Sequence, residues 1–361
     1  MDSSQKQSKI SREEEDILRV LHLPSGLYLP MILKAAIELD LFEIMAKAGP
    51  EAQLSSDEIA AAISSQNHHA PALIDRLMRF LASHSILNCS ISGGEDGIVK
   101  RLYGLEPICK HFVRNEYGTS LGSLLLLPID KVMVLPWYNL KDAILEGGAP
   151  FDKAHGMHIF DYASTDSRFN KVLNNAMYGF TTMAVRKILD VYNGFEGVKE
   201  MVDVGGGLGA TLNLITSKYP NIRGINFDLP HVIKDAPTYA GVEHVGGDMF
   251  ESVPKGEVIF MKWILHDWSD EHCLKLLKNC WKALPETGKV ILVDGVLPVY
   301  PETDLVSKIC FHSDVAMMTV NPGGKERTKD EIEKLAKSAG FADLKLICLV
   351  NCDWIIELYK N

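Results

Sequence analysis

One glycine-rich segment constrains the fold of this chain more than any other feature. Residues 202–209 read Val-Asp-Val-Gly-Gly-Gly-Leu-Gly and lie between a short apolar run and an amphipathic helical segment. Glycine is needed where a backbone turns tightly and lets a ligand approach it. A further apolar run ends at Asp228, 21 residues after Gly207, where a carboxylate can accept both hydroxyls of a ribose. The segment therefore predicts a nucleoside-binding turn between a strand and a helix.

The chain around this segment alternates between strand-like and helix-like patterns. Apolar runs typical of buried strands occur at 201–204, 224–227, 258–265, 290–293, 344–350 and 354–358. Helical segments separate the first four of them. Repeated strand–helix units predict an α/β fold with a mostly parallel, doubly wound, Rossmann-like sheet.

The first 120 residues follow a different pattern, in which helices precede two short strands. Capping-box sequences at 11–14 and 55–58 each open a helical segment. The periodicity predicts further helices over 31–46 and 71–83, and strands at 86–91 and 99–103 around the glycines of 93–97. This order is typical of a winged helix. The sequence therefore predicts two domains. The first is the helical domain 1–120, and the second is the α/β domain 121–361, in which a helical substrate-pocket segment precedes the sheet.

The acidic net charge of the chain disfavours nucleic acid and membranes as partners. It has 37 basic and 47 acidic residues, a net charge of −10, and residues 1–120 alone carry −4. A winged helix that reads DNA needs a basic face, so a non-enzymatic regulator stays only as an alternative. The first 15 residues lack the apolar core of a secretory signal, and prolines and charges interrupt the apolar stretch 121–137. We expect a cytoplasmic protein with reduced thiols and no nucleic-acid or membrane partner.

Two nucleoside cofactors are compatible with the glycine segment. Gly205, Gly207 and Ala210 formally match the dinucleotide pattern, which keeps a NAD-dependent oxidoreductase open. However, Asp203 lies two residues before the first glycine, where its charge suits a cationic ligand. A later acid, Asp248, could reach an adenine amino group. These features favour S-adenosylmethionine.

A histidine and an acid form a second group of candidate residues. His266 follows the run 258–265 and Asp294 follows 290–293, so both should lie at carboxyl ends of strands, where open α/β sheets place active sites. A phenol with a pKa near ~10 is mostly protonated at neutral pH, and histidine is suited to remove its proton. A carboxylate on the other ring nitrogen would fix the tautomer. His266 and His272 lack a standard metal-ligand spacing, so the reaction is predicted to need no metal.

The ordered motifs resemble the plant S-adenosylmethionine-dependent O-methyltransferases of the caffeic acid and isoeugenol type. The segments that carry the resemblance are 29–31, 202–207, 227–232, 246–250, 261–263, 266–270 and 321–328. The resemblance spans nearly the whole chain. It implies methyl transfer to a phenolic hydroxyl of a plant secondary metabolite, on a catechol or guaiacyl ring of a lignan, benzylisoquinoline alkaloid or phenylpropanoid. It also implies a homodimer formed by the winged-helix domain, which lends residues around 25–28 to the partner's pocket.

The resemblance also implies roles for single residues. His266 would be the general base, flanked by Asp294 and Glu326, and Asp294 is one methylene shorter than the Glu usual in caffeic acid enzymes. The candidate cofactor-binding residues are Asp203, Gly205, Asp228, Leu229, Asp248, Met249 and Lys262. The candidate acceptor-binding residues are Leu127, Pro128, Phe169, Leu173, Met177, Phe180, Trp263, Asp267, Ser313, Ala316, Met317 and Asn321.

Several of the acceptor-binding positions differ from those of the caffeic acid enzymes. Leu127 and Pro128 stand where those enzymes carry Met and Asn, and Phe180 stands where they carry His. The remaining replacements are Leu173 for Phe, and Ser313 and Ala316 for two Ile residues. One wall of the pocket should be less polar and another smaller. We therefore expect free caffeic acid to be a poor substrate and a larger, more apolar phenol to be preferred.

Overall fold

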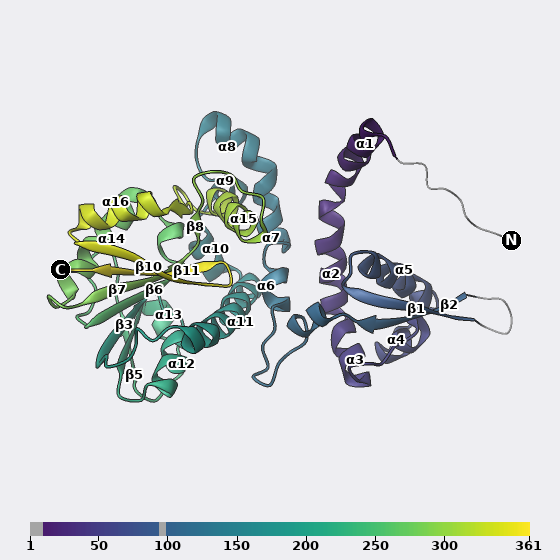
Figure 1. Ribbon diagram of the computed structural model, residues 1–361, viewed down its shortest axis with the longest axis horizontal. Coiled ribbons are helices and arrows are strands. Elements are labelled where there is room, and N and C mark those ends of the chain that lie inside the picture. The colour runs from purple at the N-terminus through teal and green to yellow at the C-terminus, as the bar shows by residue number, and fades with distance from the viewer. Residues whose placement is uncertain (1–9, 94–98) are drawn as a thin grey trace. The chain divides into compact units, whose positions relative to one another are not determined.

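The computed structural model describes residues 10–93 and 99–361. Within it the chain forms two compact units, Met1–Ile129 and Asp130–Asn361 (Figure 1). The domain boundary after residue 120 stays a prediction, because the compact units alone do not define the functional domains.

The first unit consists of short helices and one hairpin. Helices α1 and α4 begin with capping boxes at Ser11 and Ser55, in which each serine side chain accepts from the backbone of a glutamate three residues later. Its elements are α1 Arg12–His22, η1 Leu23–Leu27, α2 Tyr28–Glu38, α3 Leu41–Ala48, α4 Ser56–Ala62, α5 Ala70–Ser83, β1 Leu87–Gly93, β2 Val99–Leu105, η2 Pro107–His111 and α6 Gly122–Leu126. Strands β1 and β2 pair antiparallel, which confirms the predicted hairpin after a run of helices. The predicted turn at 94–97 lies outside the described residues.

The predicted helix over 31–46 is wrong, because the chain forms two helices there. Helix α2 ends at Glu38 and α3 begins at Leu41, and Asp40 between them takes a left-handed backbone with φ of 53°. Both helices bury apolar side chains in the same core, including Leu33 and Phe42. The apolar spacing therefore continues across a break that the periodicity does not reveal.

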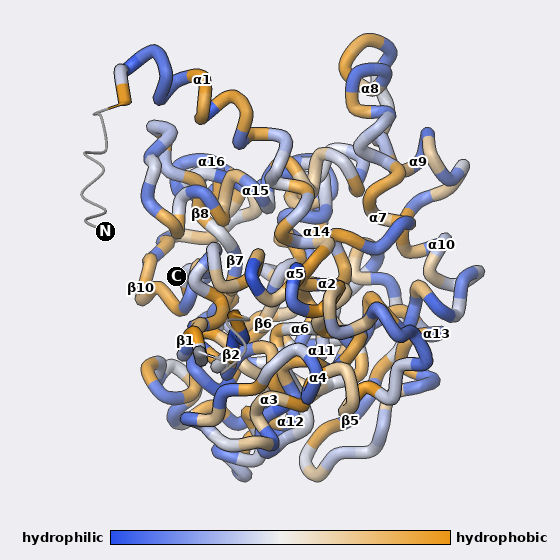
Figure 2. Tube along the Cα trace, turned by 90° about the vertical axis from the view of Figure 1, so that its right-hand side faces the viewer, coloured by the Kyte–Doolittle hydropathy of each residue, from blue (hydrophilic) through white to orange (hydrophobic). Residues whose placement is uncertain are grey.

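Residues Arg12–Glu38 are the one segment of the described chain that is long and apolar enough to cross a membrane. The segment comprises α1, η1 and α2 near the N-terminus, and only 11% of its most apolar window is buried. Its exposed apolar side chains include Ile17, Leu21 and Leu23, and hydrophilic and hydrophobic residues alternate along α1 (Figure 2). An exposed apolar patch is also typical of a surface that packs against another subunit.

The second unit is built around a seven-stranded mixed sheet of order β10-β11-β7-β6-β3-β4-β5. The strands are β3 Glu200–Val204, β4 Arg223–Asp228, β5 Val242–Gly246, β6 Val258–Lys262, β7 Lys289–Asp294, β10 Asp343–Val350 and β11 Asp353–Tyr359. Neighbours from β5 through β7 pair parallel, whereas β10 and β11 pair antiparallel. This confirms the predicted α/β sheet. The edge strand β5 was not among the predicted apolar runs, since it carries Glu243 and His244 and is only partly buried.

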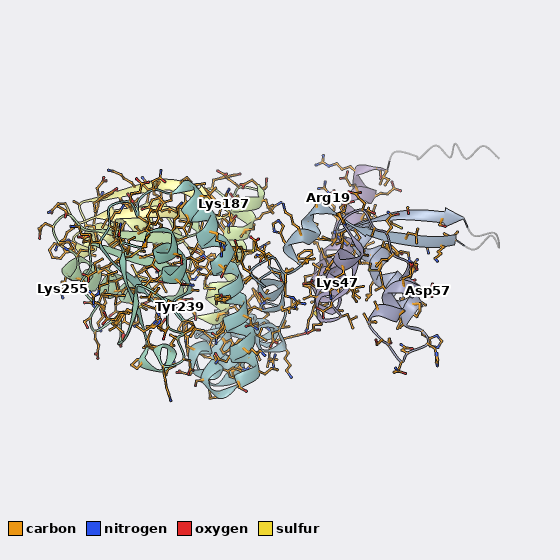
Figure 3. All side chains as sticks on the ribbon, turned by 90° about the horizontal axis from the view of Figure 1, so that it is seen from below. Arg19, Lys47, Asp57, Lys187, Tyr239 and Lys255 are labelled. Atoms are coloured by element: carbon orange, nitrogen blue, oxygen red, sulfur yellow. The ribbon has the colours of Figure 1, made fainter. Side chains whose placement is uncertain are left out.

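Helices cover both faces of this sheet. On one face α11 and α12 pack Val185, Ile188 and Leu212 against the strands, while Lys187 of α11, labelled in Figure 3, is exposed. On the other face α14 and α16 contribute Leu276 and a group of apolar neighbours. The remaining elements are α7 Lys131–Val134, η3 Leu135–Asn139, α8 Leu140–Glu146, α9 Pro150–His155, α10 Ile159–Thr165, α11 Ser167–Val191, α12 Ala210–Lys218, α13 Pro230–Ile233, η4 Leu265–Asp267, α14 Asp270–Ala283, β8 Val296–Leu297, α15 Leu305–Val320, β9 Arg327–Thr328 and α16 Lys329–Ala339. A sheet buried on both faces leaves its strand ends as the place for polar chemistry.

Candidate active site

The glycine loop joins β3 to α12. Gly205 and Gly207 take positive φ of 70° and 58°, which only glycine adopts at little cost. The Gly207 N–H donates to Asp228 Oδ2 over 2.8 Å, and Asn226 Nδ2 donates to Gly207 O over 2.8 Å. A Cβ at Gly206 would lie 2.6 Å from Asp203 Oδ2, so the loop is packed tightly against the strand ends. Asn226 was not among the residues predicted from the sequence, where its only signal is a polar residue inside a buried strand.

The carboxylates beside this loop fit a cationic nucleoside ligand. Asp203 is buried, and its Oδ2 has no hydrogen-bond partner among the described residues. Burial, aided by Asp228 and opposed by Lys262, raises the pKa of Asp203 to about 8. A ligand cation near this orphaned oxygen would relieve the desolvation cost. Asp228 also accepts from the Leu229 N–H over 2.7 Å, and lies at the end of β4 as predicted.

The other candidate cofactor residues lie at neighbouring strand ends. Asp248 and Met249 follow β5, and Asp248 Oδ1 accepts from the Phe250 N–H over 2.8 Å. Lys262 is the last residue of β6, and its Nζ lies 4.0 Å from the Trp263 ring centroid. Burial lowers the pKa of Lys262 to about 8, against the attraction of Asp353, Asp294 and Asp203. These placements agree with a binding site along one sheet edge, while each residue's contact with a cofactor stays a prediction.

The structure corrects the local positions of His266 and Asp294. Strand β6 ends at Lys262, and His266 lies on the short helix η4 rather than directly after the strand. Ile264 and Leu265 remain part of the core after the chain has left the sheet, which is why the apolar run is longer than the strand. Asp294 is the last residue of β7 rather than the first residue beyond it.

His266 is held by a carboxylate that is distant in the sequence. Its Nδ1 lies 2.8 Å from Glu326 Oε1, across 60 residues, and both side chains are buried. Ser313 Oγ donates to the same oxygen over 2.6 Å. The Glu326 carboxylate can only accept here, so the ring donates from Nδ1–H and leaves Nε2 as its acceptor nitrogen. Ser313, predicted as part of a pocket wall, therefore also orients Glu326.

The surrounding acids favour the protonated imidazole. Burial works to lower the pKa of His266, but the carboxylates of Asp267, Glu326 and Asp294 outweigh it and raise the pKa to about 9. Asp267 Oδ1 lies 3.8 Å from His266 Nε2. Asp294 is buried without a hydrogen bond to either oxygen from any described residue, and burial raises its pKa to about 8. Glu326, and not Asp294, is thus the acid bonded to the ring.

Some of the predicted acceptor-binding residues surround this histidine. The Trp263 ring stacks on Phe180 with centroids 4.4 Å apart and lies 6.0 Å from the His266 ring. Asn321 Nδ2 donates to Asp267 Oδ1 over 2.6 Å and lies 3.7 Å from Met317 Sδ.

The other acceptor-binding candidates are less directly connected to His266. Leu173 and Met177 on α11 and Ala316 on α15 are half-buried, and Phe169 is fully buried against Tyr162. Leu127 is buried and Pro128 exposed at the end of the first unit.

Arg327, which was not among the predicted site residues, fixes the segment that carries His266. It is buried, and its guanidinium donates to Leu265 O and to Trp268 O, each over 2.7 Å. It also donates to Asp270 Oδ1 over 2.9 Å. The only signal in the sequence was its position next to Glu326. The Glu326–Arg327 pair therefore holds both the ring and the backbone of η4.

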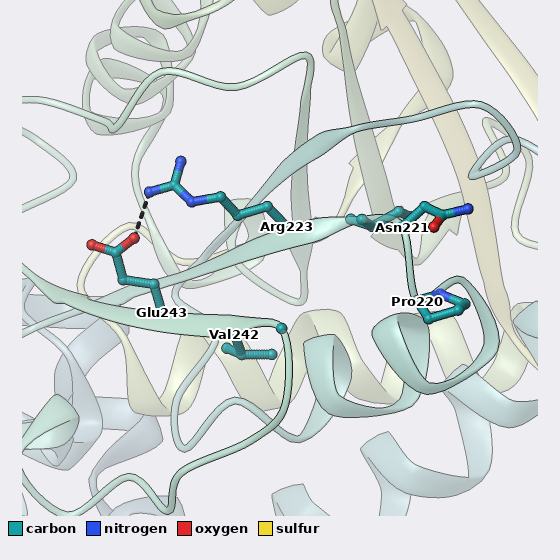
Figure 4. A pocket seen from close by; sticks show the side chains of 7 residues that line it. Pro220, Asn221, Arg223, Val242 and Glu243 are labelled. Carbon is teal, nitrogen blue, oxygen red and sulfur yellow. Dashed lines mark hydrogen bonds and ion pairs between the residues drawn. The ribbon is translucent and has the colours of Figure 1, made fainter.

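A shallow depression of about 410 Å³ lies elsewhere on the second unit. It is lined by residues 220–223 and 241–243, at the amino ends of β4 and β5. Arg223 Nη2 pairs with Glu243 Oε2 over 2.5 Å across it (Figure 4). Arg223 also bonds Glu200. These charges satisfy one another, and the glycine loop follows the carboxyl end of β3, at the opposite edge of the same sheet.

No group of three His, Cys, Asp or Glu side chains in residues 10–93 and 99–361 has the arrangement to hold a metal ion. The seven cysteines are free thiols. Metal independence of the reaction stays a prediction.

Known proteins match both units of the chain. Residues 137–342 match the O-methyltransferase domain, and residues 21–115 match the O-methyltransferase dimerisation domain. Caffeic acid 3-O-methyltransferase of Catharanthus roseus is 56% identical over 98% of each chain. Caffeic acid 3-O-methyltransferase 1 of Populus tremuloides is 58% identical over 97% of this chain and 96% of that protein.

A solved structure matches the fold over the full length. Human N-acetylserotonin methyltransferase, crystallised in complex with SAM, aligns with a TM-score of 0.81 over 100% of this chain and 99% of that one, at 22% identity. At this identity the likeness concerns the fold alone. The matches to both domains, together with relatives above half identity over nearly the whole length, decide against the oxidoreductase and regulator alternatives. The chain belongs to the S-adenosylmethionine-dependent O-methyltransferases.

Proposed function

We propose that this protein methylates a phenolic hydroxyl of a plant secondary metabolite, with His266 as general base. The observation that carries the proposal is the buried hydrogen bond of 2.8 Å between His266 Nδ1 and Glu326 Oε1. It leaves Nε2 to accept a proton. The caffeic acid enzymes among the relatives support a phenol as acceptor.

The chemistry follows from the roles of the chain's own residues. When bound, S-adenosylmethionine supplies an electrophilic methyl group. His266 Nε2 removes the phenolic proton, and Glu326 stabilises the imidazolium that results. Asp267 lies 3.8 Å from Nε2, where its charge supports the same imidazolium. After the reaction the proton stays on Nε2 until it exchanges with solvent.

The same proposal covers the cofactor site, the oligomer and the compartment. Asp203, Gly205, Asp228 and Leu229, together with Asp248, Met249 and Lys262, would hold the cofactor along the carboxyl ends of β3 to β6. The first unit would form a homodimer, for which the match of residues 21–115 to a dimerisation domain is the support. A cytoplasmic location, and domains that divide after residue 120, belong to the same proposal.

The proposed function is tested by incubating the protein with S-adenosylmethionine carrying a labelled methyl group and a panel of phenols. The panel should include caffeic acid, lignans and benzylisoquinoline alkaloids. Labelled methyl ethers, identified by mass spectrometry, are the expected products. Failure of every phenol to accept the label would contradict the proposed function.

Asp228→Ala is expected to weaken the binding of S-adenosylhomocysteine by about 10–100-fold, because hydrogen bonds to a charged group are lost. Titration calorimetry measures this affinity. Asp235→Ala, an exposed acid a short distance along the chain, serves as the matched control and should bind as the wild type does. NAD should give no binding heat with any of the three proteins. Equal affinities for Asp228→Ala and the wild type would remove Asp228 from the cofactor site.

The acceptor preference gives another prediction. Phe180 stands where the caffeic acid enzymes carry His, and its ring stacks on Trp263. Because this wall of the pocket is then less polar, kcat/KM should be higher for a multi-ring phenol than for caffeic acid. Phe180→His should move the ratio toward caffeic acid by about tenfold, the size typical of one changed pocket contact. Tyr178→His, on an exposed position of the same helix, is the control. A kcat/KM for caffeic acid above that for every multi-ring phenol would refute this preference.

A further inference from the structure

Trp263 has an uncommon backbone conformation next to His266. It is the residue after β6, and its φ is 57°, in the left-handed region that few residues other than glycine adopt. Its backbone N–H donates to Val293 O of β7 over 3.1 Å. A bulky residue keeps such a conformation only where its surroundings hold it, and such positions gather at functional sites.

The indole of Trp263 is bonded to a carboxylate on the last strand. Trp263 Nε1 donates to Asp353 Oδ1 over 3.1 Å, across 90 residues of sequence. Sheet register brings the two together. Lys262 pairs with Val293 between β6 and β7, and Asp294 pairs with Trp354 between β7 and β11. Asp353 therefore begins β11 where β6 and β7 end, at the sheet edge that carries His266.

Asp353 is poorly explained as a purely structural residue. It is only 4% exposed, and its Oδ2 has no hydrogen-bond partner among the described residues. Burying a carboxylate that is only half satisfied costs stability. Nothing in the catalytic proposal uses it, since His266 is held by Glu326. The indole N–H is the closest hydrogen-bond donor to this carboxylate among the described residues, since Cys352 Sγ lies 3.9 Å from Oδ1 and Lys262 acts on Asp353 through its charge.

The position of the indole matters for the acceptor. The ring lies nearly parallel to Phe180, at an interplanar angle of 18°, and 6.0 Å from the His266 ring. Lys262 Nζ lies 4.0 Å from the Trp263 centroid and 5.5 Å from that of Phe180. A rotation of the indole about its χ angles would break the stack with Phe180 and move the aromatic wall next to the base. The bond to Asp353 opposes that rotation.

We propose that Asp353 is a positioning residue for the acceptor site, which holds the Trp263 indole against Phe180 beside His266 and so sets the fit of the phenol ring. This inference rests on the proposed function. In this proposal Asp353 acts through Trp263 rather than by contact with the acceptor or the methyl donor. Its loss should therefore affect acceptor binding more than the chemical step.

The test compares Asp353→Ala with Asp353→Asn in the full-length enzyme, using the best phenol from the panel. The Ala variant should raise the acceptor KM by about tenfold and change kcat by less than about threefold, as expected for a lost hydrogen bond that positions a binding wall. The Asn variant keeps an oxygen that can accept from the indole and should restore KM to near the wild-type value. Affinity for S-adenosylhomocysteine should be the same in both variants.

Two further variants complete the test. Asp343→Ala, at the exposed start of β10 in the same hairpin, is the matched control and should leave KM unchanged. Trp263→Phe keeps an aromatic ring but removes the N–H donor, so it should raise KM as Asp353→Ala does, even if the Ala variant fails to fold.

The outcomes separate this inference from the proposed function. An unchanged KM in Trp263→Phe or in a folded Asp353→Ala variant would overturn the inference, and so would an Asn variant as impaired as the Ala variant. A wild-type enzyme that methylates no phenol would instead contradict the proposed function itself.

Discussion

Replacing His266 with Gln is expected to lower kcat by about 10²–10⁴-fold, the contribution typical of a positioned general base. The glutamine amide can still form hydrogen bonds, but it cannot take the phenolic proton. Affinity for S-adenosylhomocysteine should stay near the wild-type value, because the glycine loop and Asp228 lie on other strands. Steady-state kinetics and calorimetry measure the two quantities. His272→Gln, an exposed histidine on α14, is the matched control.

The pH dependence gives this prediction a second readout. The carboxylates around His266 raise its pKa to about 9 against the effect of burial. Below that pH the ring of the free enzyme holds a proton and cannot act as a base, so kcat/KM should rise as the pH increases through about 9. In His266→Gln only the ionisation of the phenol itself should remain. If His266→Gln kept nearly the full wild-type rate at neutral pH, the base would be another group.

Removing Glu326 should have the next largest effect. Glu326→Ala deletes the acceptor for His266 Nδ1 and the nearest charge that stabilises the imidazolium, so kcat should fall by roughly 10²-fold, the lower end of the contribution typical of general acid–base catalysis. Because a carboxylate that favours the charged ring is lost, the pKa of His266 should decrease, and the rise of kcat/KM should move to lower pH. Steady-state kinetics across pH measure both changes.

Asp294 supplies the comparison for this second prediction. Its oxygens form no hydrogen bond with His266 in the structure, and it influences the ring only through its charge. Asp294→Asn should therefore slow turnover by less than about tenfold, since a lost charge interaction without a hydrogen bond costs less than both together. A larger loss in Asp294→Asn than in Glu326→Ala would mean that Asp294 orients the imidazole during the reaction. Thermal melting of both variants would show whether either loss comes from unfolding.

The local features of this chain were predictable from its sequence. Ser11, Ser55 and Thr328 cap helices because a serine or threonine oxygen and a glutamate three residues later satisfy neighbouring backbone N–H groups. The buried strands follow from continuous apolar runs, and the glycine turn follows from its composition. The approximate location of the site follows as well, because parallel strands bring their carboxyl ends to one edge.

Some predicted ends of strands and helices were wrong, because apolar packing continues where the secondary structure stops. Ile264 and Leu265 belong to the core although β6 ends at Lys262, so the apolar run did not locate His266. The break at Asp40 was hidden for the same reason. An apolar pattern records which residues are buried, and burial does not require one unbroken strand or helix.

The partners of the catalytic side chains were decided only by the tertiary structure. The sequence by itself determined that a histidine and several acids would meet at one sheet edge. It did not determine that Glu326, 60 residues away, would bond His266 while the nearer Asp294 would not. Nor did it indicate that Ser313 would support Glu326, or that Asp353 would bond the indole of Trp263. The physical reason is that a hydrogen bond depends on positions within a few tenths of an ångström, which strand register and helix packing fix, whereas a sequence pattern specifies only the face or the end of an element.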